Sequence, residues 1–359
     1  MRAVSLFAGA GGMDVGFSDA GVSIVWANEL DLDAAQTYIK NNPDTMLRQG
    51  DIKRLKEELQ QFDEGSIDLV FGGPPCQGFS VAGKMDPDDE RSKLIWEYMD
   101  VVNILKPKIF VMENVKALGK LQRWQSVREK IVSRAHDMGY TCFYKVLNAA
   151  DFGVPQKRER VFFIGFLDTD ADVEKIFETE IIKLIKPRVT VRDCLRKLPP
   201  AGTEGNPITC TAKISLAANP VMRKSPYAGM LFNGMGRPLD ISSQANTLPA
   251  SMGGNKTPIL DELLLEDPEA ENWVVQYHTE LAQANKKVSR IVPSHIRRIT
   301  TVEAAAIQTF PPTYQFVGEK SSIYRQIGNA VPCNLAFAIA EAIISIYNEA
   351  YLTKARVYA

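Results

Sequence analysis

Residues 67–80 read Ile-Asp-Leu-Val-Phe-Gly-Gly-Pro-Pro-Cys-Gln-Gly-Phe-Ser, an apolar run that stops at two glycines and two prolines. A short apolar run that ends in such a turn predicts a buried strand. The turn places Cys76 at the carboxyl end of that strand, the edge where open α/β sheets bind ligands. A lone cysteine is most often a small buried residue. Because two prolines stiffen the backbone before Cys76 and Gly78 follows it, the pattern favours a thiolate presented to a ligand.

Strand and helix patterns alternate on both sides of this stretch. Alternation of this kind predicts an α/β fold with a doubly wound, mostly parallel sheet. Further turns with polar residues follow strands at Asn28-Glu29, Gly50-Asp51 and Glu113-Asn114-Val115. The patterns predict strands at 4–7, 22–26, 109–112, 141–147 and 161–166, and helices that end at Phe17 or cover 94–105 and 124–138.

The composition changes near Leu198. Residues 199–260 hold 15 Gly and Pro in 62 positions, which predicts a smaller, loop-rich domain of short strands. Regular structure is expected again near Ile296. Thr300 and Glu303 have the spacing of a capping box that opens a helix, and Pro332 suits the first turn of a final helix.

The overall composition is that of an ordinary folded chain: 359 residues, 45% hydrophobic, 24% charged, with a net charge of −1. No apolar run is expected to reach the ~18 residues of a membrane span. Five dispersed cysteines and three histidines predict no zinc site and suit a reducing cytoplasm. Residues 183–237 carry ten basic residues against two acidic ones, and Lys286, Lys287, Arg290, Arg297 and Arg298 form a second basic cluster. These clusters can hold a polyanion, or they are solvated surface.

A glycine-rich turn, Phe7-Ala8-Gly9-Ala10-Gly11-Gly12, follows the first predicted strand. It lacks the third glycine of a pyrophosphate-binding fingerprint, because position 14 is Asp14. Glu29 lies 20 residues after Gly9, where a carboxylate can accept both hydroxyls of a ribose. Asp51 can accept a hydrogen bond from an adenine amino group. These features fit an adenosine ligand without phosphates, and they favour S-adenosylmethionine over NAD.

The chain resembles the bacterial DNA (cytosine-5)-methyltransferases of restriction-modification systems along nearly its whole length. The motifs that carry the resemblance occur in the family's order, and one mild departure is Met13 after the glycines. They are residues 6–12, Asn28-Glu29, Gly50-Asp51-Ile52, residues 73–80, Arg91-Ser92-Lys93-Leu94, Glu113-Asn114-Val115, residues 156–161, residues 298–311 and residues 325–332.

The resemblance implies a Rossmann-like domain that binds S-adenosylmethionine and releases S-adenosylhomocysteine. It implies a catalytic domain over 1–195, a target-recognition domain over 196–296, and a segment over 297–359 that returns to the catalytic domain. Double-stranded DNA would bind between the two domains. The implied cofactor-binding residues are Phe7, Gly9, Gly11, Glu29, Asp51, Pro74, Leu94 and Asn329.

By resemblance, Cys76 is the nucleophile that adds to C6 of cytosine, and Glu113 is the carboxyl group at N3. Arg158 and Arg160 alternate, so that in one extended segment both would point the same way. The family places Arg158 near the cytosine O2 and Arg160 against the catalytic carboxylate or loop; the alternatives are a helix-capping role for Glu113 and a surface pair of arginines. The target atoms are inaccessible in a stacked duplex, so the base must be flipped out.

Contacts to the opened DNA are expected at Gln77 and Ser80, in a mobile loop over 77–93, and at Thr247 beside the flipped nucleotide. Arg223, Arg237, Gln244 and Asn255 have side chains suited to base edges, although phosphate contacts or plain loop surface fit them equally. The resemblance also implies a bacterial cytoplasmic or nucleoid location. A cognate restriction endonuclease that acts on the same site is a further expectation. No membrane contact is expected, and a near-neutral chain without coiled-coil heptads predicts a monomer.

Three other functions compete with this interpretation. An RNA cytosine-5 methyltransferase on the same scaffold would carry a Cys-Phe-Thr signature in the small domain, which is absent. A non-catalytic DNA-binding homologue predicts the loss of Cys76, Glu113 or the glycines, and all of them are present. A nucleotide-dependent oxidoreductase is disfavoured by the missing third glycine.

Overall fold

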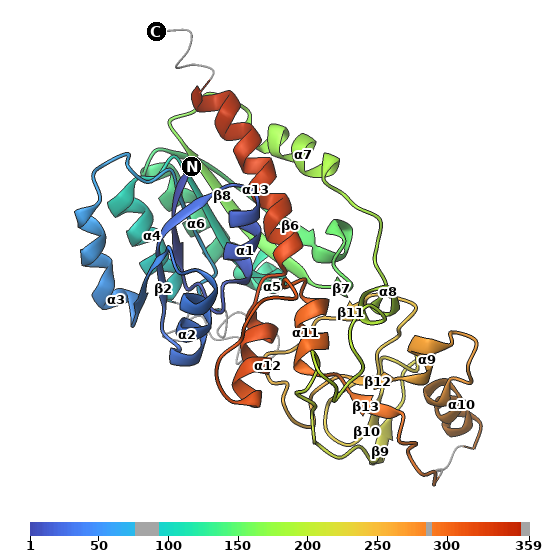
Figure 1. Cartoon of the computed structure of the whole chain (residues 1–359). Coiled ribbons are helices and arrows are strands. Elements are labelled where there is room, and N and C mark those ends of the chain that lie inside the picture. The colour runs from blue at the N-terminus through green and yellow to red at the C-terminus, as the bar shows by residue number, and fades with distance from the viewer. Residues whose placement is uncertain (76–92, 285–288, 353–359) are drawn as a thin grey trace. The chain divides into compact units, whose positions relative to one another are not determined.

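The fold is built on a seven-stranded sheet in the order β3-β2-β1-β4-β5-β8-β6 (Figure 1). The structure is a computed structural model, and it describes residues 1–75, 93–284 and 289–352. Strands β3, β2, β1, β4 and β5 are parallel to one another, whereas β8 runs antiparallel to both β5 and β6. This sheet confirms the predicted α/β class with a mostly parallel, Rossmann-like arrangement.

The chain divides into two compact units, which are described separately. The first contains residues 1–152, 159–186 and 331–359, and the second contains 153–158 and 187–330. The elements of the first unit are β1 (Arg2–Leu6), α1 (Gly12–Asp19), β2 (Ser23–Glu29), α2 (Leu32–Asn41), β3 (Met46–Gln49), α3 (Ile52–Leu55), η1 (Lys56–Gln61), β4 (Leu69–Gly72), α4 (Leu94–Leu105), β5 (Ile109–Val115), α5 (Lys116–Lys120), η2 (Gln122–Trp124), α6 (Gln125–Asp137), β6 (Tyr140–Asn148), η3 (Ala149–Phe152), β8 (Glu159–Leu167), α7 (Val173–Lys183), α13 (Cys333–Tyr347) and η4 (Asn348–Leu352).

Successive residues of β1 serve opposite faces of the sheet. Val4 and Leu6 join the apolar core formed with α4, α5 and α6. Ser5 belongs to the other face, where α1 and α13 pack side by side (Figure 1). On that face Phe17 of α1 stacks on Phe71 of β4, with ring centroids 4.3 Å apart. Both faces are therefore covered, as expected for a parallel sheet.

The contact between α1 and α13 depends on one glycine. A Cβ atom at Gly16 would lie 2.4 Å from both the Cys333 carbonyl oxygen and the Phe337 amide nitrogen. Those atoms belong to the backbone of α13, so they cannot rotate away as a side chain would. The two helices therefore approach as closely as they do because position 16 has no side chain.

Replacing Gly16 with Ala is expected to destabilise the first unit by about 2–4 kcal/mol, because the new methyl group must separate two packed helices. Thermal unfolding of both proteins measures the effect as a clear drop in Tm. The exposed Ser18→Ala change on the same helix should leave Tm nearly unchanged. A Gly16→Ala protein as stable as the wild type would contradict this packing.

The stretch Lys320–Tyr351 is long and apolar enough to cross a membrane by length and composition alone. The expectation that no apolar run reaches that length is therefore wrong. The most apolar window of this stretch is 67% buried within the fold. Because α13 packs on α1 and α7, it has the character of a core helix.

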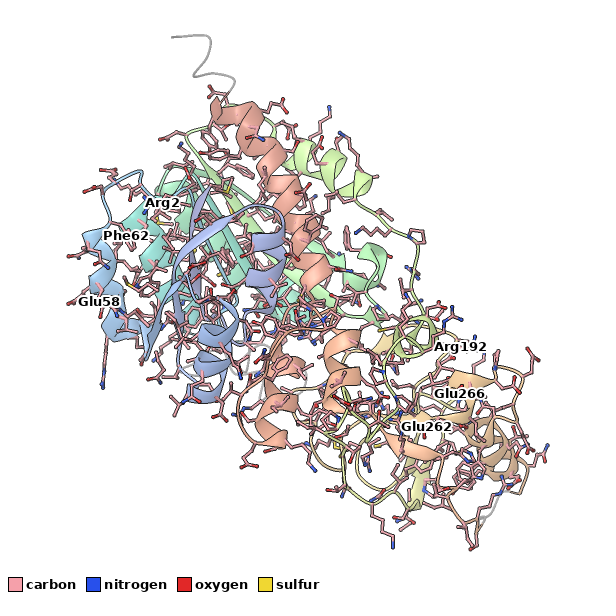
Figure 2. The ribbon with its side chains drawn as sticks, in the orientation of Figure 1. Arg2, Glu58, Phe62, Arg192, Glu262 and Glu266 are labelled. Carbon is pink, nitrogen blue, oxygen red and sulfur yellow. The ribbon has the colours of Figure 1, made fainter. Side chains whose placement is uncertain are left out.

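The second unit is richer in loops, as predicted, but it holds more helix than the sequence suggested. Its elements are β7 (Gln156–Lys157), α8 (Val191–Leu195), β9 (Leu216–Val221), β10 (Met230–Phe232), β11 (Ala245–Asn246), β12 (Ile259–Asp261), α9 (Leu263–Glu266), α10 (Trp273–Ala284), β13 (Ile296–Arg298), α11 (Thr301–Ile307) and α12 (Lys320–Asn329). Arg192 of α8 donates to the carbonyls of Leu265 and Glu266 at the end of α9 (Figure 2).

The predicted capping box is confirmed. The Thr300 hydroxyl accepts from the Glu303 amide, and the Glu303 carboxylate accepts from the Thr300 amide. Pro332 is the N-cap of α13 and so immediately precedes its first turn. The compact units differ in extent from the domains expected at 1–195, 196–296 and 297–359: α11 and α12 pack with α8 in one apolar core, which places 297–330 in the second unit.

Candidate functional site

The sheet reverses its winding between β1 and β4, because β2 lies on one side of β1 and β4 on the other. At such a switch point the loops after the two strands separate and leave a crevice for a ligand. The loop after β1 is the glycine-rich turn at 7–11, and the loop after β4 begins at Gly73 and leads to Cys76. Cys76, Gln77 and Ser80 lie outside the described residues.

The glycine-rich turn has an unusual backbone. Phe7, Gly9 and Gly11 all have left-handed conformations, with φ of 54°, 58° and 81°. The two glycines adopt these angles without strain, and a Cβ at Gly9 would meet nothing within 4 Å. The Gly9 amide donates to Glu29 Oε2 at 2.8 Å. The turn is therefore fixed to the end of β2 while its surface stays open.

Glu29 is held from two sides. Oε2 accepts from Gly9, and Oε1 accepts from the Asp31 amide at 2.7 Å. Burial raises the pKa of this carboxyl group, and the backbone hydrogen bonds oppose the rise. Each oxygen keeps a second lone pair that can accept a ligand hydroxyl. The geometry fits a vicinal diol such as a ribose.

Asn28 links the ends of β2 and β3. Its buried side chain donates to the carbonyls of Arg48 at 3.2 Å and Gly50 at 2.8 Å. The Gly50 amide donates back to the Glu29 carbonyl at 2.9 Å. Asp51 then caps α3, with Oδ1 accepting from the Lys53 amide. Asn28 therefore positions Asp51 relative to Glu29, a role that its place in the Asn28-Glu29 motif did not reveal.

Leu30 is a second residue that the sequence analysis missed. It directly follows Glu29, and its side chain is 64% exposed. A large apolar side chain beside a carboxylate that is suited to accept a diol can cover the flat face of a base. The signal was available in the sequence, because an apolar residue there interrupts the polar Asn28-Glu29-Leu30-Asp31 turn.

The backbone before Cys76 is fixed by glycines and by Asn114. A Cβ at Gly72 would lie 2.0 Å from the Leu6 carbonyl oxygen, and one at Gly73 would lie 2.8 Å from Glu113 Oε2. The fully buried Asn114 amide donates to the Pro74 carbonyl at 3.2 Å. Asn114 therefore ties the turn that leads to Cys76 to the strand that carries Glu113.

Glu113 and Arg160 form an ion pair in the first unit. Arg160 Nε lies 2.9 Å from Glu113 Oε1, and each side chain is 13% exposed. The pairing of β5 with β8 sets this contact, since Glu113 and Arg160 lie close together on the antiparallel strands. The predicted contact between Arg160 and the carboxylate agrees with this geometry. Glu113 therefore lies near the carboxyl ends of the parallel strands, where Arg160 holds it and Gly73 packs closely against it. A carboxylate in this position is suited to interact with the polar atoms of a base.

Arg158 belongs to the second unit, whereas Glu113 and Arg160 belong to the first. Arg158 is 2% exposed, and its guanidinium donates to the carbonyls of Leu248 at 3.3 Å, Gly328 at 2.9 Å and Asn329 at 3.4 Å. The expected single extended segment does not exist. β7 pairs with β11 and β8 pairs with β5, and Arg158 lies in the break between them. This environment suits a residue that holds loops together, rather than one beside cytosine O2.

Replacing Arg158 with Met is expected to destabilise the second unit by about 2–4 kcal/mol, because the buried carbonyls of Leu248 and Gly328 and the carbonyl of Asn329 lose their charged donor. The loss appears as a lowered Tm or urea midpoint. Arg196→Met, at an exposed position of the same unit, should be neutral. Reduced activity with unchanged stability would point back to a contact between Arg158 and the substrate.

Two glutamines extend this arrangement. Gln156 Oε1 accepts from the Leu248 amide at 2.9 Å, and Gln156 Nε2 donates to Gln308 Oε1 at 2.8 Å. Gln308 Nε2 donates to the Ile327 carbonyl. Thr247, which is exposed, donates its hydroxyl to the Lys157 carbonyl at 2.9 Å. Thr247 and Leu248 therefore have a fixed backbone within the second unit.

The residues proposed to read bases differ in their surroundings. Arg223 and Arg237 are exposed. Gln244 is half-buried and donates to the Val189 carbonyl at 3.3 Å, while Asn255 Oδ1 accepts from Asn233 at 3.5 Å. Of the other predicted residues, Phe7 and Leu94 are half-buried and Pro74 is buried in the first unit, and the exposed Asn329 belongs to the second unit.

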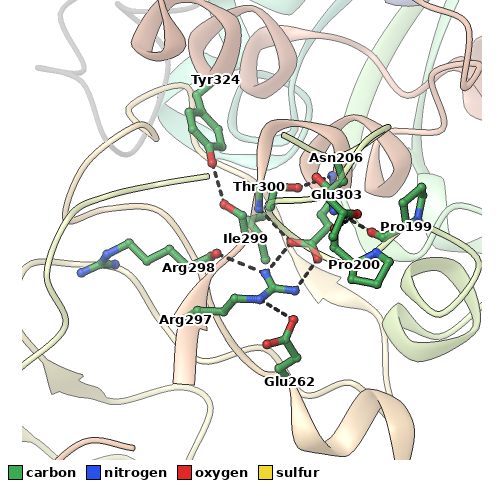
Figure 3. A network of polar contacts seen from close by, with 11 residues as sticks. Pro199, Pro200, Asn206, Glu262, Arg297, Arg298, Ile299, Thr300, Glu303 and Tyr324 are labelled. Atoms are coloured by element: carbon green, nitrogen blue, oxygen red, sulfur yellow. Dashed lines mark hydrogen bonds and ion pairs between the residues drawn. The ribbon is translucent and has the colours of Figure 1, made fainter. Parts of the chain in front are cut away.

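The second basic cluster is not a polyanion surface in its described part. Arg297 binds Glu262 at 2.9 Å and Glu303 at 2.7 Å (Figure 3). Arg298 is 2% exposed and donates to the Thr257 carbonyl at 2.7 Å. Arg290 lies over the Trp273 ring and 3.2 Å from Glu280. Lys286 and Lys287 lie outside the described residues. The sequence could not show this because acidic partners such as Glu262 are distant along the chain.

No group of three or more metal-ligating side chains occurs within residues 1–75, 93–284 and 289–352. The described site offers carboxylates, backbone amides and apolar surface. Those groups suit an organic ligand with hydroxyl and amino groups.

The chain matches the family model described as C-5 cytosine-specific DNA methylase over residues 1–345. Among curated proteins it is 33% identical to the Type II methyltransferase M1.HphI of Haemophilus parahaemolyticus, over 96% of this chain and 86% of that protein. It is also 33% identical to the Type II methyltransferase M.NgoPII of Neisseria gonorrhoeae, over 96% of this chain and 95% of that protein.

Solved structures share the fold. A putative DNA modification methyltransferase encoded within an E. coli prophage superposes with a TM-score of 0.67 at 23% identity, covering 97% of this chain and 99% of the other. The S. pombe Dnmt2 methyltransferase superposes with a TM-score of 0.65 at 18% identity, covering 97% and 98%.

Proposed function

This chain belongs to the family of C-5 cytosine-specific DNA methylases, and from that membership we infer that it transfers a methyl group from S-adenosylmethionine to C5 of cytosine in double-stranded DNA. The observation that carries the inference is the arrangement at one sheet edge. The Gly9–Glu29 contact, Asp51, the turn before Cys76 and the Glu113–Arg160 pair all lie at the carboxyl ends of the parallel strands or on β8 beside them.

The cofactor would be held by the residues of the first unit. Glu29 accepts the ribose hydroxyls, Asp51 accepts from the adenine amino group, and Leu30 covers one face of the base. Bound there, S-adenosylmethionine supplies an electrophilic methyl group on its sulfonium ion. The open backbone at Gly9 lets the ligand approach closely, and the missing third glycine suits a ligand without phosphates.

The chemistry would begin at Cys76. Its thiolate forms a bond to C6 of a flipped-out cytosine, and the electron pair of the C5–C6 double bond becomes available at C5 and N3. Glu113 shares a proton with N3 and so stabilises the added negative charge. C5 then takes the methyl group, and its proton passes to a base such as water, which leaves the electron pair of the C5–H bond to reform the double bond. Cys76 leaves as the C5–C6 double bond forms again.

We propose roles for Arg158 and Arg160 that differ from those expected by resemblance. Arg160 forms an ion pair with Glu113 and is partly exposed, so we assign it a contact with the cytosine O2 as well as the one with the carboxylate. Arg158 is assigned to positioning the Thr247-Leu248 and Gly328-Asn329 loops. Gln77 and Ser80 stay predicted contacts to the opened DNA. Contacts to DNA stay predictions also for Thr247, Arg223, Arg237, Gln244 and Asn255.

The biological setting is proposed from the relatives. Proteins named Type II methyltransferases are similar to this chain over nearly its full length, which supports a role beside a cognate restriction endonuclease. A monomer in the bacterial cytoplasm is the corresponding expectation for its assembly and location.

One incubation experiment tests the reaction and its nearest alternative. The purified protein is given S-adenosylmethionine with mixed-sequence duplex DNA in one arm and with transfer RNA in the other. Base-resolution sequencing and nucleoside mass spectrometry should find 5-methylcytosine in a short duplex site. Methylation of the RNA alone would favour an RNA methyltransferase, and methylation of exocyclic amino groups would exclude the proposed attack at C6.

A further inference from the structure

A buried carboxyl group in α1, just after the glycine-rich turn, has no part in the proposed chemistry. Asp14 lies in the first turn of α1, three residues after Gly11, and it is fully buried. Its Oδ1 accepts a hydrogen bond of 2.9 Å from the hydroxyl of Tyr38, which is itself fully buried in α2. An isolated carboxylate is costly in a protein interior, so this group needs an explanation.

The two helices that this bond joins are those that begin at the cofactor site. Gly11 is the N-cap of α1 and closes the glycine-rich turn. Asp31 is the N-cap of α2, and its amide donates to Glu29 Oε1. Glu29 thus contacts the turn before α1 through Gly9 and the start of α2 through Asp31. The Asp14–Tyr38 hydrogen bond joins the same two helices through fully buried side chains.

The second oxygen of Asp14 is poorly satisfied. Neither Asp14 Oδ2 nor the Ser5 hydroxyl has a hydrogen-bond partner among the described residues, and both are buried. Ser5 is close enough to lower the pKa of Asp14, but the contact between them lacks hydrogen-bond geometry. Such a group persists where the position it fixes matters more than the stability it costs.

The charge environment of Asp14 is acidic or neutral. Burial raises the pKa of Asp14 to about 6, the close Ser5 hydroxyl and the hydrogen bond from Tyr38 oppose that rise, and the nearby charge of Glu29 adds to it. From α13, the Cys333 thiol is the titratable group that interacts with Asp14. The groups that act on Asp14 therefore come from β1, β2, α2 and α13, and none of them is basic.

We propose that Asp14 and Tyr38 form a brace that positions the cofactor site, by fixing α1 and its glycine-rich turn to α2 and Glu29. This proposal rests on the proposed use of Gly9 and Glu29 in binding S-adenosylmethionine. It assigns no step of the reaction to Asp14. Loss of the brace weakens cofactor binding because Gly9 and Glu29 no longer keep their mutual geometry.

The test compares two buried tyrosines in the first unit. Tyr38→Phe removes the hydroxyl of the brace. Tyr140→Phe removes a hydroxyl that donates to the Pro107 carbonyl at 2.7 Å, before β5 and therefore at the opposite edge of the sheet. Calorimetry with S-adenosylhomocysteine should show a Kd about threefold to tenfold higher for Tyr38→Phe, and unchanged for Tyr140→Phe, while both lose similar stability.

Two Asp14 variants complete the test. Asp14→Asn keeps an acceptor for Tyr38 and should retain wild-type affinity, whereas Asp14→Leu should match Tyr38→Phe. A carboxyl group whose folded-state pKa lies above its unfolded value contributes stability at low pH that is lost as pH rises. The contribution of Asp14 should therefore decrease as pH rises from about 4 toward 7, and the Tm of Asp14→Asn relative to that of the wild type should rise over the same range.

The outcomes separate this proposal from the proposed function. An unchanged Kd in Tyr38→Phe, or an equal change in Tyr140→Phe, would overturn the brace while leaving cofactor binding established. A wild-type protein that binds neither S-adenosylhomocysteine nor S-adenosylmethionine would overturn both.

Discussion

Replacing Cys76 with Ala is expected to reduce methyl transfer by at least about 10⁴-fold, because no other group can form the bond to C6. An ordinary cysteine thiol has a pKa of about 8.5, and its thiolate form is the nucleophile. The turn before it is fixed by Asn114 and the two glycines, and the change to Ala alters neither. Transfer of a labelled methyl group to duplex DNA measures the loss.

Cys194→Ala is the matched control for the loss of a thiol. Burial raises the pKa of Cys194 to about 11, so it is a neutral thiol under assay conditions, and it lies in α8 of the second unit. That variant should transfer methyl groups like the wild type. Binding of DNA and S-adenosylhomocysteine should survive in Cys76→Ala. Measurable turnover by Cys76→Ala would rule out the thiolate mechanism.

Replacing Glu113 with Gln is expected to lower kcat by about 10²- to 10⁴-fold, because the amide cannot share a proton with N3 as charge develops there. Gln keeps the length and shape of Glu and can still accept from Arg160, so the pair of strands stays in place. Single-turnover kinetics with saturating DNA and cofactor isolate the chemical step. Binding constants should change little, because the carboxylate acts mainly in the transition state.

Glu159→Gln provides the control for Glu113. Glu159 lies on the same sheet beside Arg160, and its carboxylate pairs with Lys116 at 2.6 Å on the surface. An exposed ion pair contributes little, so this variant should keep its rate. Equal losses in the two variants would mean that Glu113 acts through the general charge of the region. An unchanged rate in Glu113→Gln would remove it from the mechanism.

The local patterns of the sequence predicted several elements of both units well. The strand before Cys76, the helix 94–105 and the capping box at Thr300 depend on residues close together in the chain, so their signals are complete within a short window. The polar turns after the strands likewise follow from the order of strands in a parallel sheet. These features could be predicted without long-range contacts.

The features that were missed depend on partners far along the chain. From its place in the alternating Arg158-Glu159-Arg160 sequence, Arg158 is indistinguishable from a surface residue. Only its hydrogen bonds to the carbonyls of Leu248 and Gly328 show that it is buried. Arg297 belongs to a basic run, yet Glu262, 35 residues earlier, neutralises it. The brace between Asp14 and Tyr38 likewise joins two helices whose separation no local pattern sets. Tertiary packing decides these cases.

The most direct measurement of the central claim is a covalent trap. A duplex that carries 5-fluorocytosine at the methylated position is incubated with the protein and S-adenosylmethionine. The fluorine cannot leave as the C5 proton does, so the thiolate cannot be expelled. Peptide mass spectrometry should find a methylated fluorocytosine adduct on Cys76, and none in Cys76→Ala. A protein that binds this duplex and forms no adduct, or an adduct on another residue, would contradict the account.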